Sequence, residues 1–353
     1  MKPGIVAALA AAALFGVSTP LAKILLGTIP PAMLAGLLYL GSGIGLGAWH
    51  LLLQRRRRAD GVRSGSQRFS GADWRRLGGA VAAGGVAGPL LLMIGLSTTP
   101  AATASLLLNL EAVLTVLLAW CIFHEHVDRR VAIGMGCIVA GGSLLSLGEG
   151  AASVTTGALA IVAACFFWAV DNNLTRTIAA GDAVQIAAIK GLVAGSVNLT
   201  LAMLVVPGAT LPPPTLMLAA AIVGLAGYGI SLVLFVIALR HLGAARTGGY
   251  FSLAPFVGAA LSLALPGESA GWQFWLAGML MGIGLWLHLS ERHAHPHEHE
   301  PMTHSHPHVH DEHHRHTREG GLDTSEPHTH EHRHEPMVHS HPHYPDIHHR
   351  HRH

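Results

Sequence analysis

The chain has 353 residues, of which 50% are hydrophobic and only 12% are charged, and its formal net charge is +2. A mean hydropathy of +0.43 indicates a protein that resides in lipid, and it argues against a water-soluble globular domain as the main body. The three cysteines, Cys121, Cys137 and Cys165, lie in apolar runs without redox or metal-ligand spacing. We therefore expect them to be small buried side chains and exclude a disulfide framework.

Apolar segments of roughly 20 residues, the length that crosses a bilayer core, follow one another as far as Ser290. In chain order they cover residues 4–26, 32–53, 77–96, 101–123, 131–147, 157–178, 183–206, 216–239, 244–265 and 272–290. The first segment could be a signal peptide, but it has the length of a span and leads into a second apolar segment, so a retained helix is favoured. We predict an all-α integral membrane protein with ten transmembrane helices, followed by a disordered tail.

Two stretches of the chain, residues 101–147 and 244–289, are variants of one pattern. Each has an apolar run, a polar break that contains Glu125 or Glu268, and a second apolar run rich in glycine. The matched residues are Ala101 with Ala245, Thr103 with Thr247, Leu117 with Leu261 and Gly134 with Gly278. The pattern resembles the EamA-type repeat of the drug/metabolite transporter superfamily. That resemblance implies a carrier of two five-helix repeats with opposite membrane orientation, here residues 1–148 and 155–290, and a His-rich tail over residues 291–353.

An odd number of helices per repeat makes the second repeat start from the opposite side of the membrane. Inverted repeats of this kind are typical of alternating-access carriers. We therefore expect a multi-pass secondary transporter, an exporter of a small organic metabolite. The alternative is a transporter of Zn, Ni or Co whose tail collects or senses the cargo. An enzyme is not expected, because the spans contain no H-E-x-x-H motif and no nucleophile and base at helical spacing.

Basic residues predict the orientation of the chain. With ten alternating spans, 20 of the 22 lysines and arginines fall at the termini or in loops on one side, and only Lys23 and Lys190 lie within spans. Positively charged loops stay in the cytoplasm. We therefore expect a protein of the cell membrane, the inner membrane where there are two, with both termini cytoplasmic. We interpret the run of four arginines at positions 55–58 as a topology anchor rather than a specific site for anionic lipid.

Few polar residues lie inside the spans, and such residues are costly in lipid. Glu111 lies near the midplane, and its counterpart in the second repeat is Pro255, the residue that the family usually shows there. The carboxyl group suits proton coupling. If Lys190 reaches it instead, the pair would hold a conformation or bind a zwitterion.

Asp171 and Lys190 lie at similar depths on consecutive helices, so they could form an ion pair that serves either function or helix register. Asn172 and Asn198 are candidates for substrate binding, with hydrogen bonding between helices as the alternative. Trp168 is a candidate for lining a cavity. Glu125 and Glu268 match the family's glutamate at the end of the repeat, where we expect them to organise loops.

The tail contains 22 of the 27 histidines and almost no apolar residues, so it cannot form a core. Its segment HEPMTHSHPHVHDEHHRH, from His299, returns as HEPMVHSHPHYPDIHHRH from His334. Closely spaced imidazoles suit Zn, Ni or Cu, and the alternative is a pH-responsive polyelectrolyte. The candidate ligands are His304, His306, His308, His310, His313, His314, His339, His341, His343, His348 and His349.

The expected partners follow from these features. They are membrane lipid, a small-molecule substrate and transition-metal ions on the tail. No cofactor is required for transport, no nucleic-acid partner is expected, and a homodimer stays open as an alternative.

Overall fold

A computed structural model places two compact units in the chain, residues 1–291 and 292–353, and each is described by itself. The structure describes residues 3–59, 70–123, 129–147, 155–176, 183–242, 244–265, 268, 270–290, 294–299, 303–308, 328–333 and 337–342. Lys2, Glu125, His310, His313, His314, His343, His348 and His349 lie outside these ranges.

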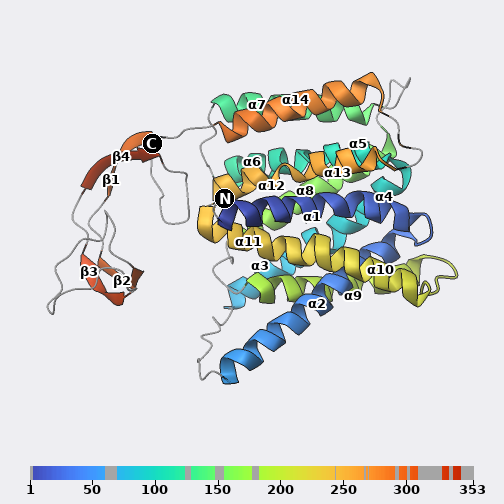
Figure 1. Cartoon of the computed structure of the whole chain (residues 1–353), viewed down its shortest axis with the longest axis horizontal. Coiled ribbons are helices and arrows are strands. Elements are labelled where there is room, and N and C mark those ends of the chain that lie inside the picture. Colours follow the sequence, from blue (N-terminus) through green and yellow to red (C-terminus); the bar gives the residue numbers. More distant parts are fainter. Residues whose placement is uncertain are drawn as a thin grey trace. The chain divides into compact units, whose positions relative to one another are not determined.

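The elements described in the first unit are helices joined by turns and short links (Figure 1). The first half contains α1 (Pro3–Leu26), α2 (Pro31–Ala59), α3 (Gly71–Ala80), η1 (Val81–Ala87), α4 (Gly88–Thr98), α5 (Ala101–Leu107), α6 (Leu110–Phe123) and α7 (Arg129–Ser146). The second half contains α8 (Thr156–Arg176), α9 (Ala183–Val205), α10 (Pro214–Gly224), η2 (Leu225–Ile230), α11 (Ser231–Leu242), α12 (Ala244–Phe251), α13 (Ala254–Ser262) and α14 (Trp272–Leu289). Among the described residues, seven helices are long and apolar enough to cross a membrane.

The same irregularities occur at equivalent places in the two halves. The π-helices η1 and η2 each interrupt the third long helix of their half, and they begin 144 residues apart, at Val81 and Leu225. The helix that follows is also broken in each half, and at equivalent positions: α5 ends at Leu107 and α12 ends at Phe251. Matching breaks of this kind show that the sequence repeat is also a structural repeat.

The break in the fourth helix of each half has a local cause. In the second half, Pro255 lies in the first turn of α13 and cannot donate a hydrogen bond to a preceding turn, so α12 cannot continue through it. The first half has no proline there, and the side chain of Asn109 instead donates to the carbonyl of Leu106 at 3.0 Å.

Equivalent helices run in opposite directions along the bundle. Figure 1 shows α5 and α6 running from right to left, whereas their counterparts α12 and α13 run from left to right. The halves pack through α7 against α14 and through α2 against α9. Glycine permits the second contact, because a Cβ atom on Gly191 would lie only 2.6 Å from the backbone nitrogen of Gly43.

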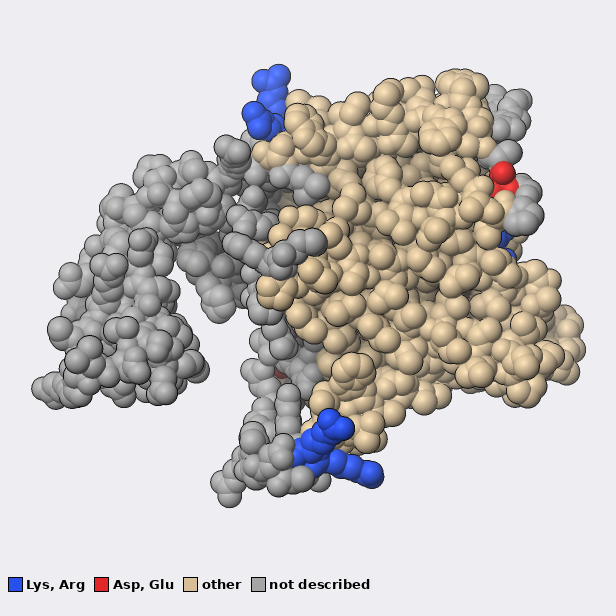
Figure 2. Space-filling view, viewed as in Figure 1, with Lys and Arg blue, Asp and Glu red and all other residues tan. Residues whose placement is uncertain are grey.

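Charged side chains lie mainly at the ends of the bundle. We name the end where α1 begins, α2 ends and α3 begins the basic end, because the arginines that flank α2, α3 and α7 lie there. The opposite end is the far end. Figure 2 shows that the broad middle of the visible face carries no Lys, Arg, Asp or Glu. Large apolar side chains are exposed instead, including Trp272, Trp275 and Trp286, as expected for a surface in contact with lipid.

The described residues of the second unit form four short strands. They are β1 (Ala294–His299), β2 (Thr303–His308), β3 (His328–Arg333) and β4 (Met337–Pro342). Strand β1 pairs antiparallel with β4, and β2 pairs antiparallel with β3. The sequence predicted disorder for the tail as a whole, and most of residues 291–353 lies outside the described ranges. The four described segments are extended and paired through their backbones.

Candidate functional site

The carboxyl group of Glu111 is hydrogen-bonded to the amide of Asn172 on α8. Glu111 lies at the start of α6, just past the helix break, and its side chain is half-buried. Asn172 Nδ2 donates to Glu111 Oε1 at 2.8 Å and lies 3.5 Å from the hydroxyl of Thr115. The side chain of Asn172 is exposed although it belongs to a span-length helix. A polar group with this exposure within a span is expected to face a wet cavity rather than lipid.

The neighbouring amide has a different role. Asn173 Nδ2 donates to the carbonyl of Ala169 on its own helix at 2.9 Å and to the carbonyl of Thr115 on α6 at 3.3 Å. Asn173 is buried, and its bond to Thr115 joins α8 to α6. Consecutive asparagines therefore differ in function: Asn173 fixes the helix pair, and Asn172 presents its amide to Glu111.

Lys190 forms an ion pair with Asp171. Its ammonium nitrogen lies 2.6 Å from both carboxylate oxygens of Asp171, and the side chains are only 13% and 10% exposed. The hydroxyl of Thr175 donates to Asp171 Oδ1 at 2.8 Å and completes the cluster. The predicted pair is therefore present. Lys190 does not reach Glu111 in this structure.

The π-helix η1 is held from several helices through the backbone of Gly84. The hydroxyl of Tyr39 on α2 and the indole Nε1 of Trp168 on α8 both donate to the Gly84 carbonyl, at 2.9 Å and 3.0 Å. The carboxylate of Asp171 occupies the space where a Cβ atom on Gly84 would lie. Trp168 is buried, and its hydrogen bond holds η1; a place for it in the lining of a cavity stays a prediction.

Asn198 also contacts η1. Its Nδ2 donates to the carbonyl of Gly85 at 3.1 Å, and its side chain is fully buried. Among the described residues its Oδ1 has no hydrogen-bond partner. The sequence grouped Asn198 with Asn172, but the structure places the two amides on different partners.

Aromatic rings from both halves meet beside this cluster. The ring of Phe15 lies 6.4 Å from Trp168, 5.8 Å from Tyr228 and 5.4 Å from Phe251, measured between centroids. Tyr228, in η2, also lies 5.4 Å from Tyr39. Since 144 residues separate Gly84 from Tyr228, the two π-helices contribute equivalent positions to the junction of the halves.

Pro255 lies apart from these polar contacts. It is buried in the first turn of α13, and its neighbour Ala254 packs on Gly16 of α1. The repeat position that carries Glu111 in one half therefore serves helix packing in the other.

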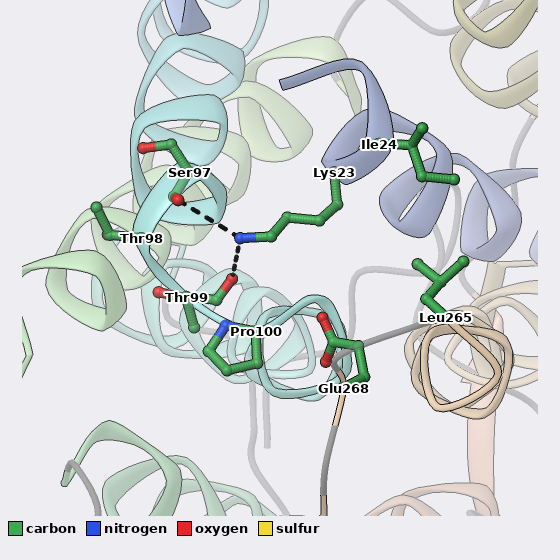
Figure 3. A pocket seen from close by; sticks show the side chains of 8 residues that line it. All are labelled: Lys23, Ile24, Ser97, Thr98, Thr99, Pro100, Leu265 and Glu268. Atoms are coloured by element: carbon green, nitrogen blue, oxygen red, sulfur yellow. Dashed lines mark hydrogen bonds between the residues drawn. The ribbon is translucent and has the colours of Figure 1, made fainter. Parts of the chain in front are cut away.

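A cavity of about 690 Å³ opens at the far end (Figure 3). Its lining residues are Lys23, Ile24, Ser97, Thr98, Thr99, Pro100, Leu265 and Glu268. Glu268 accepts hydrogen bonds from the backbone of α5, as expected for a residue that organises a loop. The cavity therefore combines an ammonium group and a carboxylate from different halves of the chain.

The described residues contain no group of three or more His, Cys, Asp or Glu side chains that could hold a metal ion. The backbone is described for His304, His306, His308, His339 and His341, but their side chains lie outside the description. The metal prediction for the tail therefore stays a prediction.

Sequence reasoning missed Tyr39, Gly84 and Thr115. A signal for Gly84 was present in the glycine-rich run GGAVAAGGVAG, which indicated only close packing. The repeat offset aligns Gly84 with the aromatic Tyr228. That alignment would have distinguished Gly84 from the other glycines of the run.

Comparison with known proteins gives consistent results. A model of the EamA-like transporter family matches residues 2–147 and 155–290. An uncharacterized transporter from Methanothermobacter thermautotrophicus is 29% identical over 298 residues, which cover 80% of this chain and 85% of that protein. A crystal structure covers 80% of this chain and 95% of its own, with a TM-score of 0.57 and 22% identity, which shows a shared fold.

Proposed function

Because the chain belongs to the EamA-like transporter family, we propose that it exports a small organic metabolite by alternating access between two inverted five-helix repeats. Family and relative identify a transporter and not an enzyme. Support for ten spans comes from the helices: α3–η1–α4, α5–α6, α10–η2–α11 and α12–α13 each count as one interrupted span, and the other six helices as one each. Support for inversion comes from the opposite directions of equivalent helices (Figure 1).

The observation that carries the proposed mechanism is that Asp171 and Glu111, on the packed helices α8 and α6, have different partners. Asp171 has the ammonium group of Lys190, whereas the described side-chain hydrogen bond of Glu111 is with the neutral amide of Asn172. An intramembrane carboxyl group without a cation partner is costly as an anion and can be neutralised by a proton. Glu111 is therefore the residue that we assign to proton exchange.

Asn172 gives Glu111 a partner in either protonation state. Its Nδ2 donates to the carboxylate, and a protonated carboxyl group also offers an oxygen acceptor. The exposure of Asn172 supports the proposal that a solute can approach the carboxyl group from this side. Proton release on one side and uptake on the other would then drive antiport of the metabolite.

The test is the variant Glu111→Gln, which keeps size and the contact with Asn172 but cannot exchange a proton. Extracellular metabolites are compared by mass spectrometry in cells with and without the wild-type protein, and the metabolite that changes is assayed in vesicles with an imposed proton gradient. We expect Glu111→Gln to insert normally and to lose gradient-driven accumulation. Asp73→Asn, which removes the charge of a half-buried carboxylate that accepts from Ser70 at the start of α3, is the control. Normal accumulation by Glu111→Gln would show that the carboxyl group serves packing only.

We place the basic end on the cytoplasmic side of the cell membrane. The described arginines at positions 55, 56, 75, 76, 129 and 130 flank helices at this end, and positive charge is retained in the cytoplasm. Both chain termini would then be cytoplasmic, and the far end would face outward.

A metal-binding tail is a separate proposal that rests on sequence. The duplicated H-S-H-P-H core places imidazoles at alternate positions, a spacing that suits Zn, Ni or Cu. We assign the tail a buffering or regulatory role. The alternative of a metal cargo receives no support from the described membrane helices, where no cluster of metal-ligating side chains occurs.

A further inference from the structure

The turn between α4 and α5 is held at the far end by a lysine from the first helix. Lys23 Nζ donates to the carbonyls of Leu96 at 2.6 Å and Thr99 at 2.9 Å, and it lies 3.4 Å from the carbonyl of Ser97 (Figure 3). These carbonyls belong to the C-terminal end of α4, where a positive charge is favourable. The three donors of the ammonium group are thereby directed to backbone groups.

The same turn is held from the other repeat. Glu268, which lies between α13 and α14, accepts from the backbone N–H of Ala101 at 2.7 Å and of Ala102 at 3.3 Å. These N–H groups lie in the first turn of α5. The residue at the N-cap position, Pro100, gives them no side-chain hydrogen bond. We name Lys23 and Glu268 the far-end clamp.

Both charges of the clamp are directed to the backbone, although they line the cavity. Figure 3 shows the Lys23 ammonium turned toward the Ser97 and Thr99 carbonyls. The two charges are therefore better explained as groups that hold the helix ends in place than as a binding site for a charged ligand. What matters is that Glu268 ties the second repeat to a helix of the first.

We propose that the far-end clamp is a contact of one transport state only, and that Lys23 and Glu268 are positioning residues whose release lets α5 move. This inference rests on the alternating access proposed above. If the repeats rock against each other, the far end cannot open at α5 until Ala101 and Ala102 separate from Glu268. Loss of the clamp should then favour the state in which α5 has moved away from the second repeat.

Ser105 offers a reporter of that movement. It lies one turn beyond Ala101 on α5, is fully buried, and a Cβ atom on Gly258 of α13 would lie 2.8 Å from its hydroxyl. It therefore lies at the contact between the two repeats. A cysteine at this position is close in shape to serine and reacts with an aqueous thiol reagent only when α5 and α13 separate.

The experiment measures the labelling rate of Ser105→Cys by an impermeant maleimide in membranes that contain the full chain. The reagent is applied separately to intact cells and to everted vesicles, so the result does not depend on the assigned orientation. We expect Glu268→Gln to raise the rate from the far-end face about tenfold, the population shift for losing hydrogen bonds to a charged group in one state. Glutamine retains one acceptor, but its NH₂ group opposes the second backbone N–H.

Lys23→Met tests the other half of the clamp and should act in the same direction. It also allows the clamp to be tested if the Glu268→Gln variant fails to insert into the membrane. Glu125→Gln, at the equivalent sequence position of the first repeat, is the matched control and should leave far-end labelling unchanged. The same variants without Ser105→Cys give the background from Cys121, Cys137 and Cys165.

A rate that is unchanged or lower in both clamp variants, with normal insertion, would overturn the proposal and leave Glu268 as a helix cap. Labelling needs neither substrate nor gradient. A negative result with Glu111→Gln would therefore contradict the coupling mechanism without changing this measurement, and the two failures can be told apart.

Discussion

Lys190 on α9 and Asp171 on α8, helices that follow one another in the chain, are joined by two contacts of 2.6 Å, one to each carboxylate oxygen. The pair is almost fully enclosed, and Thr175 supplies a further hydrogen bond to the carboxylate. Because Asp171 also packs against Gly84, the ion pair connects α8 and α9 to the π-helix η1. Because Lys190 pairs with Asp171, it is not the counterion of Glu111. The carboxyl groups of Asp171 and Glu111 therefore have different roles.

The ion pair predicts an asymmetric response to substitution. Lys190→Met should destabilise the folded protein by about 3–5 kcal/mol, because it leaves the buried Asp171 carboxylate without a partner. The double variant Lys190→Met with Asp171→Asn should recover most of that loss, since neither charge remains. Thermal unfolding of the purified protein in detergent measures both. A double variant as unstable as Lys190→Met alone would contradict this account.

Gly84 predicts a position-specific effect of a methyl group. Gly84→Ala would drive a Cβ atom into the Asp171 carboxylate, and overpacking of this kind costs about 1–3 kcal/mol. Gly78→Ala is the matched control on the same long helix, because its Cβ atom would meet nothing within 4 Å. We expect the first variant to lower the unfolding temperature and the second to leave it unchanged or slightly higher. Equal effects would show that η1 adjusts freely.

The proposed orientation predicts the reactivity of two loop positions. Ala209 follows α9 at the far end, and Ser64 belongs to the basic connection between α2 and α3. In intact cells, Ala209→Cys should react with an impermeant thiol reagent, whereas Ser64→Cys should react only after the membrane is opened. The reverse pattern would invert the topology.

The tail predicts pH-dependent metal binding that is independent of the carrier. A chain ending near Arg292 should still insert, because the last helix ends before it. The intact protein should bind Zn or Ni with an affinity that falls as the pH drops below about 6, since ligating imidazoles must be neutral and histidine has an ordinary pKa near 6.5. Calorimetry of the full chain against the shortened chain measures the difference. Equal metal binding by both would remove the tail as the site.

Much of the architecture was predictable from the sequence because its signals are local or periodic. Apolar runs of span length, their interruption by basic loops, and the 144-residue offset all depend on residue type and spacing alone. The spans over 101–123 and 244–265 were predicted as unbroken, however, and only the structure shows that α5 and α12 end inside them at equivalent positions, with Asn109 and Pro255 at the two breaks.

The choice of partners was decided by the tertiary structure. Depth along a helix placed Lys190 within reach of either Asp171 or Glu111, and only the packing of α8 and α9 against η1 selects Asp171. Likewise, no spacing rule predicts that Glu268 binds the start of α5, because the contact joins residues 167 positions apart. Residue type and order determine which segments enter the membrane. The angular positions of side chains on packed helices, which no single segment contains, determine which polar groups meet there.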